Sequence, residues 1–266
     1  MKVLNRKNRI LLTELTKTDF KLRYQGSILG YLWAIIRPLL MFGILYLVFA
    51  KFLRFGAEIP HYPVYLLIGT VLWNFFTECT SQGIQSLIIR SDLMRKISFP
   101  KWIIVLSATA TALINLGINL VVVIIFSLLS GVSISWTWLL VPLLILELYL
   151  LSFGLALFLG SINVKFRDIQ SIWEVLIQAL FYAIPIIYPL PMVIQYSDFA
   201  AKILMLNPIA QVIQDVRFAL ITPETITGWE ILPHLAKNIP LALVFIILLI
   251  GILVFKKKSK YFAEEI

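Results

Sequence analysis

The sequence predicts an all-α integral membrane protein with six transmembrane helices, and three observations support this fold class. Of the 266 residues, 60% are hydrophobic and only 14% are charged, and the mean hydropathy is +0.93. A soluble domain carries about 25% charged residues, so this chain lacks the polar surface to cover itself in water. The apolar residues gather into stretches of about 20, the length that crosses a hydrocarbon core. Most Lys and Arg residues lie beside alternate ends of these stretches.

Gaps between charged residues delimit the expected spans. No charged residue occurs between Lys101 and Glu147, a run too long for one helix, and the turn-forming residues 130–135 divide it. The six expected spans are residues 31–53, 63–82, 103–129, 138–162, 171–188 and 238–255. We therefore expect a transmembrane domain over residues 31–266, preceded by a cytoplasmic segment over residues 1–30.

The distribution of Lys and Arg predicts the orientation, because short loops rich in these residues stay in the cytoplasm. Most of the 23 Lys and Arg residues precede the first expected span or follow the second, fourth and sixth. Both termini are therefore expected in the cytoplasm. The net charge of +9 then faces anionic lipid, and nothing in its pattern favours nucleic acid as a partner.

Two cytoplasmic segments outside the spans are informative. In residues 2–23, Leu4, Leu11, Leu15 and Leu22 follow a helical period among basic residues, which indicates an amphipathic interface helix or a simple topology anchor. Residues 83–101 predict a short cytoplasmic helix whose apolar side chains could dock onto another protein, although a solvated basic loop has the same charge content.

The segment between the fifth and sixth spans is too long and too rich in proline for a simple connector. Helical spacing of apolar residues from Ile209 to Leu220 predicts short, partly re-entrant helices at the outer face. Broken helices at membrane depth need protein or a water-filled cavity around them, so this segment is expected to border a pathway.

Ionisable and aromatic residues inside the spans have two interpretations each. Arg37 can snorkel to the cytoplasmic boundary or contact an anionic headgroup or phosphate. Glu78, Glu147 and Glu174 are expected to form hydrogen bonds between helices. The abundant aromatic residues fit either the interfacial belt or stacking on sugar rings.

The residue types needed for catalysis are scarce. The chain has one Cys, two His and no G-x-x-x-x-G-K-[ST] motif for ATP. It also lacks the Asp-rich pair that holds magnesium in membrane transferases. We therefore expect no enzyme activity, no metal site and no cofactor on this chain.

Several motifs resemble one family, the permease subunits of type-2 ABC exporters of cell-surface polysaccharides such as O-antigen, teichoic acid and rhamnose-rich wall polymer. The resemblance covers nearly the whole chain in order. It is carried by the run from Asp19 to Pro38, residues 65–76 (YLLIGTVLWNFF), Phe99-Pro100, Phe166-Arg167-Asp168, residues 185–188 (PIIY) and Asn207-Pro208.

The resemblance implies a partnership and a substrate. Two copies of the permease would form a channel in the bacterial cytoplasmic membrane, above two separate ATPase subunits that hold ATP and magnesium. The substrate would be a polysaccharide on an undecaprenyl diphosphate carrier. Alternatives are an ion-coupled transporter, or a non-catalytic membrane partner of an enzyme acting on lipid-linked glycans.

The resemblance also implies four groups of functional residues, taken by their numbers here. The carrier diphosphate would meet Lys21, Arg23 and Arg37. Sugar contacts would come from Tyr31, Trp33, Trp73, Phe76, Phe181, Tyr182 and Tyr188. Coupling to the ATPase would use Ser91, Asp92, Leu93, Met94, Arg95 and Lys96. An external gate would include Asn207, Pro208, Asp215 and Arg217.

Overall fold

The computed structural model describes residues 5–56 and 59–262, and within these ranges it contains helices and no strands. The longer helices are α1 (Arg6–Tyr24), α2 (Trp33–Leu45), α3 (Tyr62–Ile89), α5 (Trp102–Leu129), α6 (Val141–Asn163), α7 (Ile169–Ala183), α10 (Pro208–Leu220) and α12 (Ile239–Lys258). The shorter ones are α4 (Ser91–Lys96), α8 (Leu190–Tyr196), α9 (Asp198–Met205) and α11 (Gly228–Ile231). Two 3₁₀ segments, η1 (Gly30–Leu32) and η3 (Trp136–Leu140), and a π-helical segment, η2 (Tyr46–Phe52), flank α2 and α6.

Four helical segments are long and apolar enough to cross a membrane: Gly30–Phe52, Trp102–Leu129, Trp136–Asn163 and Ile239–Lys258. They coincide with the first, third, fourth and sixth expected spans. Helix α3 corresponds to the second span and α7 to the fifth, but α7 has only 15 residues. The count of six spans therefore stays a prediction.

Helix α3 is the centre of the bundle. It packs against α2, α5, α6, α7 and α10, and most of its side chains are buried. Because protein surrounds this helix, its polar side chains can be met by other helices. This arrangement explains how α3 carries more polar residues than the four most apolar segments.

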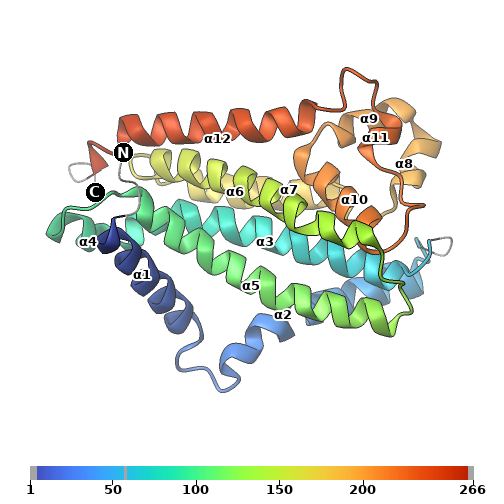
Figure 1. Ribbon diagram of the computed structural model, residues 1–266, viewed down its shortest axis with the longest axis horizontal. Coiled ribbons are helices and arrows are strands. Elements are labelled where there is room, and N and C mark those ends of the chain that lie inside the picture. Colours follow the sequence, from blue (N-terminus) through green and yellow to red (C-terminus); the bar gives the residue numbers. More distant parts are fainter. Residues whose placement is uncertain (1–4, 57–58, 263–266) are drawn as a thin grey trace.

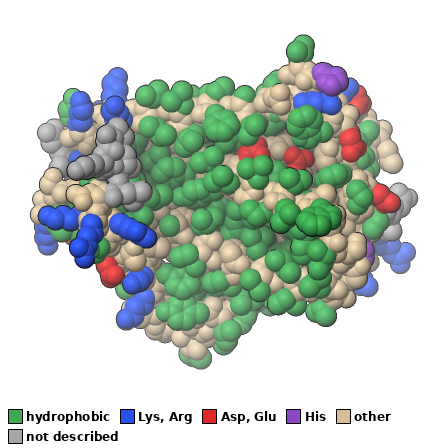
Figure 2. Space-filling model, in the orientation of Figure 1, with side chains coloured by type: hydrophobic (Ala, Val, Ile, Leu, Met, Phe, Trp, Pro, Cys, Tyr) green, Lys and Arg blue, Asp and Glu red, His purple; other side chains and the backbone are tan. Residues whose placement is uncertain are grey.

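The long helices lie lengthwise beside one another, and α1 and α2 form a bent arm on one side (Figure 1). The start of α1, helix α4 and the end of α12 lie at one end of the bundle, and α8 to α11 cluster at the other (Figure 1). On the face shown in Figure 2, apolar side chains cover most of the middle, and Lys and Arg gather mainly at the end with α4. This separation fits an apolar belt with a basic end.

Local sequence signals explain several boundaries. Proline occupies the first turn of α3, α6, α8, α10 and α12, where its missing N–H costs no helical hydrogen bond. Helices α6 and α12 approach closely where Gly154 and Gly251 meet. A Cβ on Gly251 would lie only 2.3 Å from the carbonyl oxygen of Gly154. The pair of glycines thus allows contact that larger residues would prevent.

One boundary prediction needs correction. The fifth expected span reaches residue 188, but α7 ends at Ala183, two residues before Pro185, and residues 184–188 are not helical. The expected N-terminal helix is present as α1; its Leu15 is buried and its Leu22 is 60% exposed, and its place in the membrane interface stays a prediction. Leu4 lies outside the described residues.

Candidate functional site

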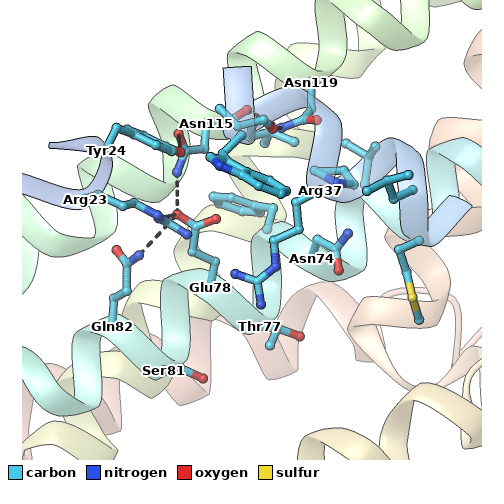
Figure 3. Close-up of a pocket in the computed structure, with 18 of the residues that line it drawn as sticks. Arg23, Tyr24, Arg37, Asn74, Thr77, Glu78, Ser81, Gln82, Asn115 and Asn119 are labelled. Carbon is cyan, nitrogen blue, oxygen red and sulfur yellow. Dashed lines mark hydrogen bonds and ion pairs between the residues drawn. The ribbon is translucent and has the colours of Figure 1, made fainter. Parts of the chain in front are cut away.

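A cavity of about 980 Å³ lies between α1, α2, α3 and α5. Arg23 and Tyr24 come from the end of α1, and Trp33 and Arg37 from the start of α2. Helix α3 contributes a polar face, and α5 contributes two asparagines (Figure 3). The cavity therefore joins the surface helix α1 to the central helix of the bundle.

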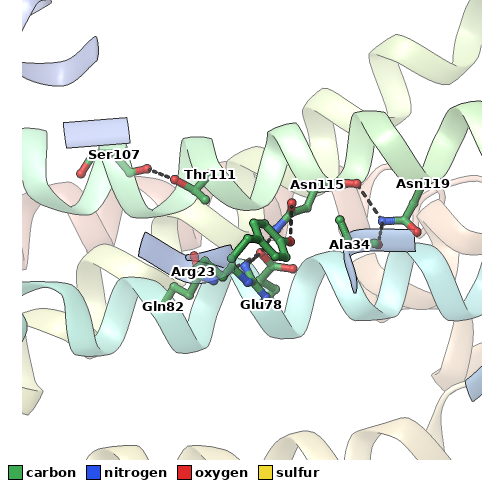
Figure 4. A network of polar contacts seen from close by, with 9 residues as sticks. Arg23, Ala34, Glu78, Gln82, Ser107, Thr111, Asn115 and Asn119 are labelled. Atoms are coloured by element: carbon green, nitrogen blue, oxygen red, sulfur yellow. Dashed lines mark hydrogen bonds and ion pairs between the residues drawn. The ribbon is translucent and has the colours of Figure 1, made fainter. Parts of the chain in front are cut away.

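Glu78 organises one wall of this cavity. Its carboxylate forms an ion pair with Arg23 and accepts hydrogen bonds from Asn115 Nδ2 at 2.6 Å and Gln82 Nε2 at 3.3 Å (Figure 4). The hydroxyl of Tyr24 donates to Asn115 Oδ1 at 3.1 Å. Burial raises the pKa of the Tyr24 phenol, which keeps it protonated as a donor. The network ties α1 to α3 and α5.

A second asparagine fixes the start of α2. Asn119 lies one turn after Asn115 on α5, and its Nδ2 donates to the carbonyl oxygens of Asn115 at 2.8 Å and Ala34 at 3.2 Å (Figure 4). Because Ala34 lies in the first turn of α2, this contact holds α2 against the same wall.

Arg37 is the cation of the cavity that lacks an acidic partner. It is exposed, lines the cavity, and makes no ion pair or side-chain hydrogen bond with any described residue. With Arg23 neutralised by Glu78, the lining keeps one unpaired positive charge. An unpaired positive charge in a cavity attracts an anionic group.

The residues predicted to meet a diphosphate are only partly brought together. Arg23 and Arg37 both line the cavity, whereas Lys21 is exposed on α1 and does not. Arg23 is also engaged by Glu78, so Arg37 has the freer guanidinium. Their role in binding stays a prediction.

The aromatic residues predicted to contact sugars fall into three groups. Trp33 lines the cavity, and Tyr31 stacks on Phe20 of α1 with 5.4 Å between ring centroids. Trp73, Phe76 and Phe181 pack together within the core. Tyr182 is 69% exposed on α7, and the Tyr188 hydroxyl donates to the Ala183 carbonyl at 2.8 Å. The structure thus brings Trp33 alone of this set to the cavity.

The predicted coupling segment forms helix α4. Met94 is buried in a cluster with Leu87 and Ile104, whereas Arg95 and Lys96 are exposed. Asp92 is exposed, and Ser91 and Leu93 are half-buried. Arg90, the residue before α4, forms an ion pair with Asp19 of α1. Helix α4 therefore presents basic side chains to solvent and is linked to the arm that borders the cavity.

The predicted external gate residues lie at or in α10. Asn207 caps this helix by accepting a hydrogen bond from the Ile209 N–H at 2.9 Å, and Pro208 is its first residue. Asp215 accepts from Gln211 Nε2 at 2.5 Å. Arg217 is fully buried and donates to carbonyl oxygens of α3 and of residues 185 and 186. The gating role of this group stays a prediction.

The three glutamates predicted to lie within spans differ in their contacts. Glu78 bonds to α1 and α5, so the prediction of bonds between helices is confirmed for this residue. Glu147 Oε1 is buried and has no hydrogen-bond partner among the described residues, so a bond between helices stays a prediction for Glu147. For Glu174 it is wrong, because this exposed carboxylate accepts a hydrogen bond from Gln170 of the same helix at 3.0 Å. No group of three His, Cys, Asp or Glu residues that could hold a metal ion occurs among the described residues.

Sequence reasoning missed the amide and hydroxyl groups that line the cavity. Asn74, Thr77 and Ser81 recur at helical spacing in α3, and Asn115 and Asn119 are one turn apart in α5. This spacing was a readable signal, since polar residues on one face of an apolar helix indicate a polar partner or cavity.

A bundle of membrane-length helices with a cavity that contains polar and cationic side chains is typical of membrane transport proteins. Comparison with known families defines the class more closely. The chain belongs to the ABC-2 type transporter family, whose profile matches residues 11–221.

Curated relatives span most of the chain. It is 30% identical over 257 residues to an O-antigen export system permease protein RfbA of Myxococcus xanthus, covering 96% of this chain and 95% of the relative. A protein of the same name from Klebsiella pneumoniae is 31% identical over 205 residues, or 76% of this chain and 77% of the relative. The polysialic acid transport protein KpsM of Escherichia coli is 24% identical over 212 residues, covering 76% of this chain and 78% of the relative.

Proposed function

We propose that this chain is the permease subunit of an ATP-driven exporter that moves a polysaccharide, carried on undecaprenyl diphosphate, out of the cytoplasm. Membership of the ABC-2 family supports the transporter class, and the names of the relatives support a polysaccharide as cargo. The observation that carries the assignment to a site is the cavity with its unpaired Arg37.

The chemistry of the cavity suits the head of a lipid-linked glycan. A diphosphate is a compact dianion that accepts charge-assisted hydrogen bonds, and the planar guanidinium of Arg37 can donate two of them. Apolar residues at the cavity edge, Leu40, Met41 and Ile44, continue along the exposed side of α2. They offer a surface to the polyprenyl chain while the diphosphate remains at Arg37.

Energy for export comes, in this proposal, from a separate ATPase that docks at α4. Two permeases, each with six spans and cytoplasmic termini, pair into one channel over two ATPase subunits. The exposed Arg95 and Lys96 provide the docking charges. Replacing both with Glu should abolish co-purification of the ATPase and export of the polymer, and unchanged assembly would exclude α4 as the docking site.

The test of the cavity is export by an Arg37→Ala variant in cells that lack the native gene. Surface polysaccharide should fall at least tenfold, because about 1.5–3 kcal/mol of charge-assisted binding is lost. Membrane content of the protein should be unchanged, and Arg9→Ala, a matched change of an exposed α1 arginine, should export normally. Normal surface polymer with Arg37→Ala would refute the assignment.

A further inference from the structure

The cavity wall formed by α3 contains polar side chains that no described residue satisfies. Asn74, Thr77 and Ser81 lie three and four residues apart, so they share one face of the helix. None of these side chains forms a hydrogen bond with the described parts of the chain, and Thr77 Oγ1 is buried without a partner. Buried polar atoms normally have partners, so this face is expected to meet a ligand or water.

Other hydroxyls of the same helix behave differently. Thr70 donates to the Leu67 carbonyl at 2.9 Å, Thr80 to Phe76 at 2.8 Å, and Ser86 to Gly83 at 2.8 Å. Bonding to the preceding turn is the usual way in which a helix satisfies Ser and Thr. Thr77 and Ser81 are not satisfied this way, and both line the cavity. Both hydroxyls therefore keep a hydrogen-bonding capacity that no described residue uses.

The chemistry of this face differs from that of Arg37. Figure 3 shows the Arg37 guanidinium extending toward the side of α3 that carries Asn74 and Thr77. An amide and two hydroxyls are neutral groups that both donate and accept hydrogen bonds, which suits the hydroxyls of a sugar. Trp33, 40% exposed at the same cavity, adds an aromatic surface of the kind that packs on a pyranose. A cavity of about 980 Å³ has room for more than a diphosphate.

We propose that Asn74, Thr77 and Ser81 bind the sugar directly attached to the carrier diphosphate, so that the cavity selects loaded over empty carrier. This inference rests on the proposed function, because it requires the diphosphate to lie at Arg37. It adds a specificity-determining face: Arg37 binds what both lipids share, and the α3 face binds what only the loaded lipid has.

The experiment measures binding of two lipids to the purified full-length chain in lipid nanodiscs. The probes are undecaprenyl diphosphate and undecaprenyl diphosphate carrying one N-acetylglucosamine. The wild-type protein should bind the sugar-bearing lipid about tenfold more tightly, the effect of two neutral hydrogen bonds. Thr77→Val combined with Ser81→Ala should reduce this ratio severalfold, since only Asn74 of the face remains, and leave the affinity for the bare carrier unchanged. Asn74→Ala provides a second variant of the same face.

Matched controls separate this inference from the proposed function. Thr70→Val removes a hydroxyl of α3 that is already satisfied, so it should keep the tenfold ratio. Arg37→Ala should weaken binding of both lipids. Equal affinity of the wild type for both lipids, or a ratio that persists in the double variant and in Asn74→Ala, overturns the sugar face alone. Failure of both lipids to bind the wild-type protein overturns the diphosphate site and this inference with it.

Discussion

Replacing Arg217 should weaken the packing of α10 against α3 and residues 185–186 and so lower the stability of the protein. Its guanidinium donates to three carbonyl oxygens: Nε to Tyr65 at 3.1 Å, Nη1 to Pro185 at 2.7 Å and Nη2 to Ile186 at 2.8 Å. It also lies 3.4 Å from the Tyr65 ring centroid and is fully buried. One side chain of α10 thus holds α3 and the non-helical residues that follow α7.

The size of the effect follows from the acceptors left behind. In Arg217→Met, the side-chain volume is largely kept, but the carbonyls of Pro185 and Ile186 lose these donors. A buried acceptor without a partner costs about 1–3 kcal/mol, so the two together cost about 2–6 kcal/mol. For a chain of this length, each kcal/mol lowers the melting temperature by about 2–4 °C. We expect a fall of about 5–20 °C.

A glycine provides an independent test of the same contact. A Cβ on Gly69 would lie 2.4 Å from Arg217 Nη2, so Gly69→Ala should displace the guanidinium without altering its charge. Gly117→Ala is the matched control, because no atom lies within 4 Å of the corresponding Cβ in α5. This control should melt at or slightly above the wild-type temperature, since alanine favours a helix over glycine.

The assay is thermal unfolding of the purified protein in detergent, followed by tryptophan fluorescence. Arg217→Met and Gly69→Ala should both unfold at lower temperature, and combining them should add little, because both remove the same contact. If Arg217→Met and Gly69→Ala unfold at the wild-type temperature, Arg217 does not hold α10 against α3 and residues 185–186, and the reasoning fails.

Two further predictions concern contacts between helices. Asp19→Arg should repel Arg90 and speed hydrogen exchange in α1, since it removes an Asp19–Arg90 pair worth about 1 kcal/mol, and exchanging both charges should restore protection. Arg9→Glu is the control and should leave exchange unchanged, because Arg9 is exposed on α1 and forms no ion pair with the described residues. Gly251→Val should push α12 away from Gly154 of α6 and lower the free energy of unfolding by at least about 1–3 kcal/mol. Thermal unfolding measures this change, and a variant as stable as the wild type would contradict the close contact of α6 and α12.

Apolar runs and proline positions sufficed to predict most of the helices. Four spans coincide with helical segments because length and hydropathy are local properties. The end of α7 at Ala183 was missed, although Pro185 was a local signal for it. The partial docking of α1 depends on neighbours that the chain supplies far away, and periodicity alone cannot show which leucine of a stripe finds a partner.

The charged residues of the site and Trp33 could be predicted from the sequence, but the contacts between them could not. Arg23, Arg37 and Glu78 stand out in apolar sequence, but the pairing of Arg23 with Glu78 joins residues 55 positions apart and has no local signal. The aromatic residues show the same limit. The sequence alone does not distinguish Trp33 from Trp73 as a sugar contact. Tertiary packing places Trp73 in the core and Trp33 at the cavity.

The pairing of Arg23 with Glu78 both anchors α1 at the cavity and leaves Arg37 as the free cation. Two unpaired guanidiniums in one cavity would repel each other and bind an anion tightly, which would slow its release. Glu78 neutralises Arg23 and uses it to anchor α1, so one free cation remains at Arg37. Because Asp19 and Arg90 tie the same α1 to the residue before α4, a displacement of α4 would reach the cavity through α1. Helix α1 is thus tied to the cavity wall through Arg23 and to the residue before α4 through Asp19.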